Sequence, residues 1–170
     1  MTQPPEWLPA LVNFTDYGGQ WEPYCEALYE YFRHDFIESK PKFGGRTVQL
    51  KRHPLFQGKE ATFWHITHEG RTENQRTPDL RRCERIRWPR PIIERPIIEH
   101  NCNGVIRCWP EKTGRDERIV LWIYELDYVV ILNIRKGYIL LWAAYYIIYD
   151  NKRRQLLKKY EKYIKNAGKS

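Results

Sequence analysis

The second half of the chain constrains the fold most, because it carries a regular succession of strand-like segments. After Asn103 the chain reads "GVIRCWPE", "ERIVLWIYE", "DYVVILNIR" and "YILLWAAYYII", all rich in β-branched and aromatic residues. Such residues favour strands, and Lys136 and Gly137 join the last two segments at the spacing of a compact hairpin turn. The pattern predicts an antiparallel sheet.

A helix is predicted on each side of this sheet. From Gln20 to Ser39, apolar residues recur at the three- and four-residue spacing of an amphipathic helix. The final segment starts with Asp150 or Asn151 as a cap and carries one apolar stripe: Leu156, Leu157, Tyr160, Tyr163 and Ile164. We therefore expect a single α+β domain over 20–170, with a sheet of about four to six strands, a basic C-terminal helix and an extended arm over 1–19.

Two shorter segments are also predicted to be strands. "TVQLKRH" (47–53) alternates polar and apolar residues until Pro54 ends it. "ATFWHIT" (61–67) is predicted to be a second strand, with His65 on one face and His68, just beyond it, on the other.

The segment "TPDLRRCERIR" carries the signals of a helix start. Thr77 can act as the N-cap, with Pro78 at the first helical position and Asp79 behind it. We expect the helix to end at Trp88, because the residue before Pro89 is disfavoured in the helical conformation. The duplicated unit that follows, "PIIERPIIEH", is too short to be a structural repeat.

The net charge of +8 and the isoelectric point of about 9.3 favour a polyanionic partner. From Asp150 to Ser170 there are eight Lys or Arg residues against two acidic ones. Between Arg71 and Arg95 there are eight basic residues, all of them Arg, against four acidic ones. Arginine suits bidentate recognition of phosphates and bases, whereas lysine mostly supplies diffuse positive charge.

The cysteines and the N-terminus indicate the cellular setting. No two cysteines have the spacing of a zinc or redox motif, so we expect reduced packing residues at Cys25, Cys83, Cys102 and Cys108. "MTQPPEWLPA" lacks the features of a signal peptide. The longest uncharged run, 137–149, is shorter than the ~20 residues of a membrane helix. We expect a cytoplasmic protein without membrane, metal or cofactor.

The segment "FWHITHEG" (63–70) holds the candidate acid–base chemistry. On a strand His65 and His68 would face opposite ways, and no nearby Cys or third His completes a ligand set, which argues against a metal. If the chain turns after Ile66, both imidazoles could reach one cleft, where a pKa of about 6.5 suits proton transfer. The alternative is a half-buried strand end with two hydrogen-bonded histidines.

The Arg-rich segment offers a second candidate surface. A polar loop that starts at Arg71 leads into the predicted helix, on which Arg81, Arg85 and Trp88 fall at i, i+4 and i+7. Two guanidiniums and an aromatic ring on one face could hold a phosphate and stack a base. The alternative is a solvated surface helix whose arginines pair with nearby glutamates.

Two tyrosines lie near the end of the expected last strand. Tyr145 and Tyr146 alternate, so at least one must face away from the other. Tyrosines here usually belong to the core, and the alternative is a phenol that orients a phosphate or moves a proton beside the histidines. The basic residues that follow are candidates for contacts with a nucleic-acid backbone: Lys152, Arg153, Lys158, Lys159 and Lys162.

The run "FWHITHEG…TPDLRRCERIRWPRPIIE", the sheet after it and the terminal "AYYIIYDNKRRQLLKKYEKY" resemble phage- and prophage-borne proteins of the barnase/EndoU/colicin/RelE-like nuclease superfamily. The resemblance spans roughly residues 20–165. It implies RNA cleavage without a metal, in which a base deprotonates the ribose 2′-hydroxyl, basic side chains stabilise the phosphorane, and a cyclic phosphate is released. By resemblance, the acid and base lie within the segment from His65 to Glu69, and the phosphate lies near Arg82, Arg85 and Tyr145 or Tyr146.

The chain departs from this superfamily in its last strand. Many members have Ser or Thr where this chain has Ala143 and Ala144, so either Tyr145 takes that role or the site is degenerate. Three functions stay open: an endoribonuclease, as a toxin or phage-conflict effector with an antitoxin or immunity protein; a non-catalytic nucleic-acid-binding protein; and a phage-encoded protein that binds a host protein. The two histidines favour the first, since binding alone does not need groups that titrate near neutral pH.

Overall fold

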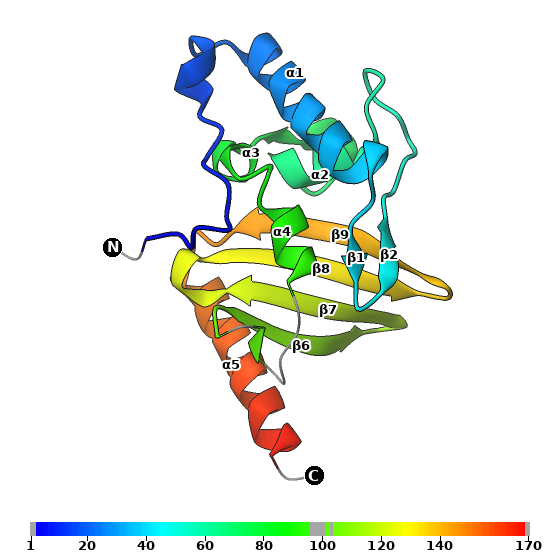
Figure 1. Cartoon of the computed structure of the whole chain (residues 1–170), viewed down its shortest axis with the longest axis vertical. Helices are drawn as coiled ribbons and strands as arrows, with labels where there is room; N and C mark the ends of the chain where they lie inside the picture. Colours follow the sequence, from blue (N-terminus) through cyan, green and yellow to red (C-terminus); the bar gives the residue numbers. More distant parts are fainter. Residues whose placement is uncertain (1–2, 96–100, 103, 169–170) are drawn as a thin grey trace.

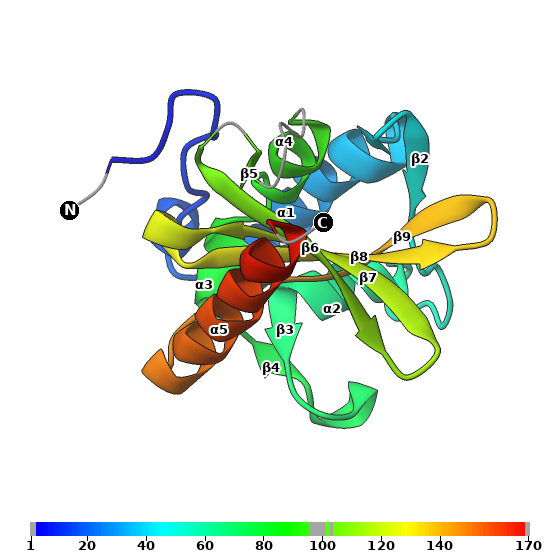
Figure 2. The ribbon, with the colours of Figure 1, turned by 90° about the horizontal axis from the view of Figure 1, so that it is seen from below.

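A mostly antiparallel sheet forms the centre of the molecule, with helices on both of its faces (Figures 1 and 2). The computed structural model describes residues 3–95, 101–102 and 104–168. Among these residues, seven strands pair in the spatial order β1 (Lys42–Phe43), β2 (Arg46–Gln49), β9 (Tyr138–Tyr146), β8 (Tyr128–Arg135), β7 (Asp116–Ile123), β6 (Ile106–Thr113) and β5 (Asn101–Cys102). The predicted single-domain α+β class is confirmed.

The four long strands β6 to β9 follow one another as antiparallel hairpins, as their sequences predicted. Val120 of β7 pairs with Trp109 on one side and with Ile131 on the other. Lys136 and Gly137 form the turn between β8 and β9. Because successive side chains point to opposite faces, these strands contribute to two separate apolar clusters, one on each side of the sheet.

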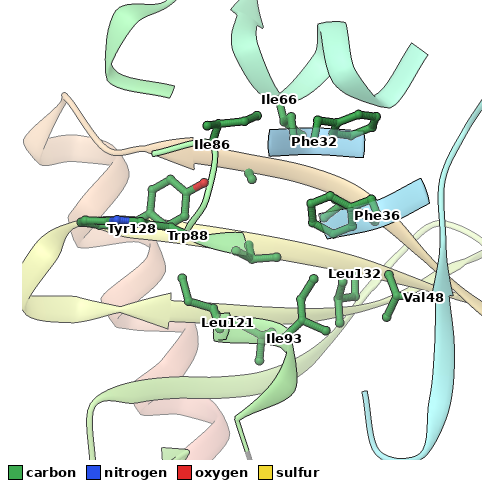
Figure 3. Packing of buried hydrophobic residues seen from close by; sticks show 14 of the residues in the cluster. Phe32, Phe36, Val48, Ile66, Ile86, Trp88, Ile93, Leu121, Tyr128 and Leu132 are labelled. Carbon is green, nitrogen blue, oxygen red and sulfur yellow. The ribbon is translucent and has the colours of Figure 1, made fainter. Parts of the chain in front are cut away.

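The predicted first helix is confirmed as α1 (Trp21–Phe32), which continues into a π-helical segment, η2 (Arg33–Glu38). The Phe32 ring of α1 packs against the Phe63 ring at 5.4 Å between centroids, and Figure 3 shows Phe36 of η2 near Leu132 and Val48 of the sheet. Phe32 and Phe36 are fully buried. Each such side chain contributes about 2 kcal/mol of hydrophobic stabilisation, which fixes the layer of helices on this face.

Strand β2 is shorter than the predicted segment 47–53, and it pairs with β9 in parallel through Val48 and Gln49. A further short strand, β1 (Lys42–Phe43), pairs with the other edge of β2. The chain leaves the sheet after Gln49 because the backbone of Lys51 bonds to the next helix: its N–H donates to Thr62 Oγ1 at 2.8 Å. The parallel pair makes the sheet mixed.

The segment 61–67 forms helix α2 (Ala61–Thr67), so the prediction of a strand was wrong. One side of the segment is buried: Thr62, Phe63, Ile66 and Thr67. This spacing is helical, and packing against β9 outweighs the preference of aromatic and β-branched residues for strands. His65 therefore lies in the last turn of α2, and His68 begins the two-residue strand β3 (His68–Glu69).

The predicted helix start at Thr77 was also wrong. Thr77 and Pro78 form strand β4 (Thr77–Pro78), which pairs with β3. Asp79 is the N-cap of α3 (Leu80–Glu84), because its Oδ1 accepts hydrogen bonds from two backbone N–H groups of the first turn, at 3.0 and 3.4 Å. Pairing with β3 thus moves the cap two residues along the chain.

The expected helix end at Trp88 was also wrong, because one helix ends before Trp88 and another begins after it. Helix α3 ends at Glu84, and a second helix, α4 (Pro89–Glu94), begins directly after Trp88. Trp88 keeps helical dihedral angles before Pro89, and the proline occupies the first helical position, where its missing N–H is not needed. The second half of "PIIERPIIEH", 96–100, lies outside the described residues.

The described part of the N-terminal segment follows the layer of helices. Leu8 and Val12 are buried, and Trp88 Nε1 donates to the carbonyl oxygen of Pro9 at 2.9 Å. A short 3-10 turn, η1 (Phe14–Tyr17), leads into α1. These contacts attach the segment to α3 and α4.

The predicted basic helix is confirmed as α5 (Asp150–Ala167), which packs on the opposite face of the sheet (Figure 2). Its N-cap is Tyr149 and neither Asp150 nor Asn151. Cys25 and Cys83 are free and buried, and Cys108 is also buried. Within the described part of the chain, no helix combines the length and apolar character needed to cross a membrane.

Candidate active site

Helix α2 carries His65 and is fixed at both ends. At the N-terminal end, Thr62 Oγ1 accepts from the N–H of Lys51 and donates to its carbonyl oxygen at 3.2 Å. At the C-terminal end, Arg82 donates through one nitrogen to the carbonyl oxygens of His65, at 3.1 Å, and His68, at 2.8 Å. Such bonds satisfy carbonyls that a helix end leaves unpaired. The position of both histidines is thus determined by their backbone.

His65 lies in a cleft of about 190 Å³, which we call the His65 cleft. Its other polar or aromatic walls come from three separate parts of the chain: Lys51, Arg76 and Trp142. The Trp142 ring lies 6.3 Å from the His65 ring, between centroids. Trp142 falls where the register of β8 and β9 shifts, and such a bulge redirects a side chain. The cleft therefore combines an imidazole, two cations and an indole.

A second, apolar cavity of about 390 Å³ adjoins this cleft, and we call it the Phe56 hollow. Its walls include Phe56, Trp64, His68 and Arg76, so Arg76 lines both cavities. The His68 ring packs against the edge of Trp64 at 5.1 Å between centroids. Arg76 and Ala61 therefore line both the cavity with His65 and the cavity with His68.

Arg76 differs from most other arginines of the site. Its side chain is partly buried, its Nε is buried without a hydrogen-bond partner, and no carboxylate pairs with it among the described residues. By contrast, Arg82 pairs with Asp79, and Arg85 pairs with Glu84. A partly buried cation without a partner favours the binding of an anion, so Arg76 is a candidate anion site.

The loop that carries Arg76 depends on Gly70. Gly70 has a φ of 137°, and a Cβ at this position would lie 2.7 Å from the carbonyl oxygen of Gln75. Only glycine allows the chain to close on itself here and return through β4. Gly70 therefore places Arg76 beside α2.

Both histidines are neutral at pH 7. Burial first, and then the charges of Arg76 and Arg82, lower the pKa of His65 and of His68 to about 4 each. Lys51 contributes further to the shift of His65. Because nearby cations cause part of each shift, a bound anion would raise both pKa values.

The tautomer of His68 follows from its neighbour. Thr67 Oγ1 donates to the carbonyl oxygen of Phe63 at 2.8 Å and lies 2.8 Å from His68 Nδ1. Because its hydrogen is used, the hydroxyl accepts from Nδ1–H, which leaves the lone pair on Nε2. His68 Nε2 is thus the nitrogen that could exchange a proton with a ligand.

Three other predicted site residues lie apart from these cavities. Glu69 is exposed at the end of β3, and Arg71 is exposed in the following loop. Arg81 is also exposed, with 61% of its side-chain surface accessible. The structure does not bring these three residues into contact with the His65 cleft.

The expectation that Trp88 offers a stacking surface is corrected by its burial. Trp88 is only 3% exposed, because it packs edge-on against Tyr128 of the sheet. Arg85 lies over it, with the guanidinium 5.1 Å from the Trp88 ring and 4.5 Å from the Tyr146 ring. A base could reach this indole only after the helices separate.

Tyr145 and Tyr146 point to opposite faces of the sheet, as expected. Tyr146 packs with the helix-side core, and Tyr145 packs with the cluster under α5. Burial raises the pKa of Tyr145 to about 12, although the cation of Arg82 acts in the other direction. Its ring centroid lies 5.9 Å from the Arg82 guanidinium.

The predicted basic residues of α5 divide into two groups. Lys159 pairs with Glu111 at 2.5 Å, and Arg153 pairs with Asp127 at 2.7 Å. Lys152, Lys158 and Lys162 are exposed. Since α5 lies under the sheet, these lysines form a surface separate from the His65 cleft (Figure 2).

Sequence reasoning identified His65 and His68 but missed Lys51, Arg76 and Trp142. Lys51 follows strand β2, Arg76 ends a polar loop, and Trp142 occupies a bulge. No local sequence pattern identifies any of them as a site residue. No family model, curated protein or solved structure matches this chain. In the described part of the chain, no cluster of three or more His, Cys, Asp or Glu residues could hold a metal ion.

We expect Arg82→Ala to lower the free energy of unfolding by about 2 kcal/mol, because it removes charged hydrogen bonds to two carbonyls and a partly buried ion pair. Arg81→Ala is the matched control, since its exposed pair with Glu84 should contribute less than about 0.5 kcal/mol. Urea denaturation measures both. Equal stability of the two variants would contradict the structural role of Arg82.

Proposed function

We propose that the chain is a cytoplasmic, metal-independent endoribonuclease that cleaves RNA through attack of the ribose 2′-hydroxyl on the adjacent phosphodiester. The observation that carries the proposal is Arg76, an unpaired cation between a cavity with His65 and a cavity with His68. In-line displacement requires a proton acceptor on one side of the phosphate and a proton donor on the other. Two imidazoles on either side of an anion site meet this requirement.

In the proposed reaction, His65 accepts the proton of the 2′-hydroxyl while the 2′-oxygen forms its bond to phosphorus. The bond from phosphorus to the 5′-oxygen breaks, and that oxygen takes a proton from Nε2 of protonated His68. The products are a 2′,3′-cyclic phosphate and a free 5′-hydroxyl. Arg76 and Lys51 stabilise the negative charge that develops on the phosphorane.

The low pKa of His65 suits a proton acceptor, whereas the pKa of His68 must rise when RNA binds. A neutral His65 is the form that can accept a proton, and it predominates above about pH 4. His68 must instead be protonated, and the negative charge of a bound phosphodiester raises its pKa. Substrate binding would therefore prepare the proton donor.

The protein is expected to cleave single-stranded RNA in the presence of EDTA, because the proposed acid, base and charge-stabilising groups are all side chains. The products should carry a 2′,3′-cyclic phosphate, which phosphorus NMR or end-specific phosphatase treatment distinguishes from a linear phosphate. An RNA with a 2′-methoxy group at every position is the control, since it lacks the nucleophile. Loss of cleavage in EDTA and its recovery with added magnesium would contradict the proposal.

A second candidate, a non-catalytic nucleic-acid-binding protein, is favoured by one observation. Both histidines have a pKa of about 4, so neither titrates near neutral pH in the unbound protein. The unpaired Arg76 and the exposed lysines of α5 would suffice for binding phosphates. Under this alternative, RNA binds in the cleft and is released uncut.

A further inference from the structure

Two large apolar side chains at the rim of the Phe56 hollow are exposed to solvent. Leu55 is 53% exposed and Phe56 is 60% exposed, although most large apolar side chains of the chain are buried. Both lie in the segment between β2 and α2, which projects beyond the helices beside α1 (Figure 1). Exposed apolar patches with polar rims mark binding sites.

The exposure of Phe56 is built into the turn that carries it. The backbones of Phe56 and Lys59 exchange two hydrogen bonds, at 3.1 and 3.0 Å, and Lys59 is held by Glu26 at 2.6 Å. Trp64 Nε1 also donates to the carbonyl oxygen of Phe56 at 3.0 Å. Several anchors therefore hold the Phe56 ring away from the core.

The walls of the hollow combine flat apolar surfaces with a few polar groups. The rings of Phe56 and Trp64 lie 5.4 Å apart between centroids, in an edge-to-face arrangement. Asn74, whose amide can donate and accept hydrogen bonds, lines the same hollow beside Arg76. An aromatic surface with an amide and a neighbouring cation fits a nucleobase attached to a phosphate.

We propose that the Phe56 hollow binds one unpaired nucleobase of single-stranded RNA, next to the phosphate held by Arg76. This inference rests on the proposed function, since it places the nucleotide on the His68 side of the bond to be cleaved. Bases in a duplex are stacked and paired, so only a single strand can present a base to the hollow. The protein therefore selects single-stranded RNA.

Charge favours a nucleic acid over an apolar peptide or a second copy of the chain as the occupant. Among the described residues that line the hollow, none is acidic, and Arg76 supplies a positive charge without an ion-pair partner among them. Lys51 and Arg52, in the segment leading to Phe56, are exposed. A polyanion gains from these cations, whereas a second copy of a chain with a net charge of +8 is repelled.

The test measures binding of a short RNA in which every ribose carries a 2′-methoxy group, so that the strand cannot be cleaved. Fluorescence anisotropy gives its Kd as a single strand and after annealing to its complement. Phe56→Ala should weaken single-strand binding about tenfold and leave duplex binding unchanged. Tyr149→Ala, which removes another exposed ring, 71% accessible, should change neither Kd.

Three results would overturn the inference. Phe56→Ala could bind the single strand with wild-type affinity, it could lose equal affinity for the single-stranded and the duplex RNA, or it could differ from the unmodified protein in oligomeric state. The last would identify a second copy as the occupant. Because the methylated strand cannot react, this result is independent of turnover. If binding depends on Phe56 but native RNA is not cleaved, the nucleobase site is supported and the ribonuclease function is contradicted. If RNA is cleaved but neither binding nor cleavage depends on Phe56, the ribonuclease function is supported and the nucleobase site is contradicted.

Discussion

Replacing His65 with alanine is expected to lower kcat/KM for RNA cleavage by about 10²–10⁴-fold, the range for loss of one general acid or base. The side chain is partly buried, and its backbone is held by Arg82, so the fold and the RNA affinity should persist. Steady-state cleavage, anisotropy and circular dichroism measure the three properties. His34→Ala is the control, because His34 is exposed and its polar partner among the described residues is the neighbouring Asp35.

The dependence of the rate on pH adds a second criterion. If His65 is the base, kcat/KM of the unmodified protein should fall with decreasing pH through a midpoint near 4, where burial and cations place its pKa. His65→Ala should lose this acidic limb. If the variant cleaves at the rate of the unmodified protein, the histidine is only a wall of the cleft, and the binding function becomes the better explanation.

Arg76→Ala is expected to lower kcat/KM by about 10²–10³-fold, as observed when one preorganised charge-stabilising group is removed. The same change should raise the pKa of His65, because a positive neighbour no longer opposes its protonation. The acidic limb of the rate profile should therefore move to higher pH. Removal of an arginine remote from His65 would not produce this displacement.

A measurement of stability distinguishes Arg76 from Arg82. Since Arg76 has no hydrogen bond or ion pair among the described residues, its removal should change the free energy of unfolding by less than about 0.5 kcal/mol. Arg115→Ala, in the exposed turn between β6 and β7, removes the same charge at a residue that does not line the cleft. Equal activity of the two variants would show that Arg76 supplies only diffuse charge.

Much of the fold could be predicted because its signals are local. Strands β6 to β9 follow one another along the sequence and are joined by short turns, so each strand can be predicted from its own residues. The pairing of β2 with β9 could not be predicted in this way. It joins Val48 to Ile139 across most of the chain, and no local pattern specifies such a partner.

Helix α2 shows how a local pattern can mislead. Over only seven residues, the sequence fits a strand, with Phe63, His65 and Thr67 on one face, as well as it fits a helix. Its composition favours the strand. The segment forms a helix because it packs over β9, which buries the apolar side of the helix. The wrong element also placed the two histidines on opposite faces, although the chain turns after Thr67 and both histidines line cavities beside Arg76.

The candidate site was predicted only in part, because it is assembled by tertiary structure. The two histidines carry a recognisable chemical signal, whereas Lys51, Arg76 and Trp142 meet only when three distant segments fold together. The resemblance to the nuclease superfamily predicted Arg82 and Arg85 near the phosphate. Their guanidiniums are bonded to carbonyl and carboxylate oxygens, a role that composition cannot distinguish from phosphate binding.

The position of α2 has a consequence for self-association. From Leu141 to Tyr146, strand β9 pairs with β8 on one side, and no strand of the described chain pairs with its other edge. Helices α2 and α3 pack against this strand instead. An uncovered edge is a template for strands of other molecules. Helix α2, which carries His65, therefore also prevents strands of other molecules from pairing with β9. A change that displaces α2 from β9 should cause aggregation and disrupt the His65 cleft together.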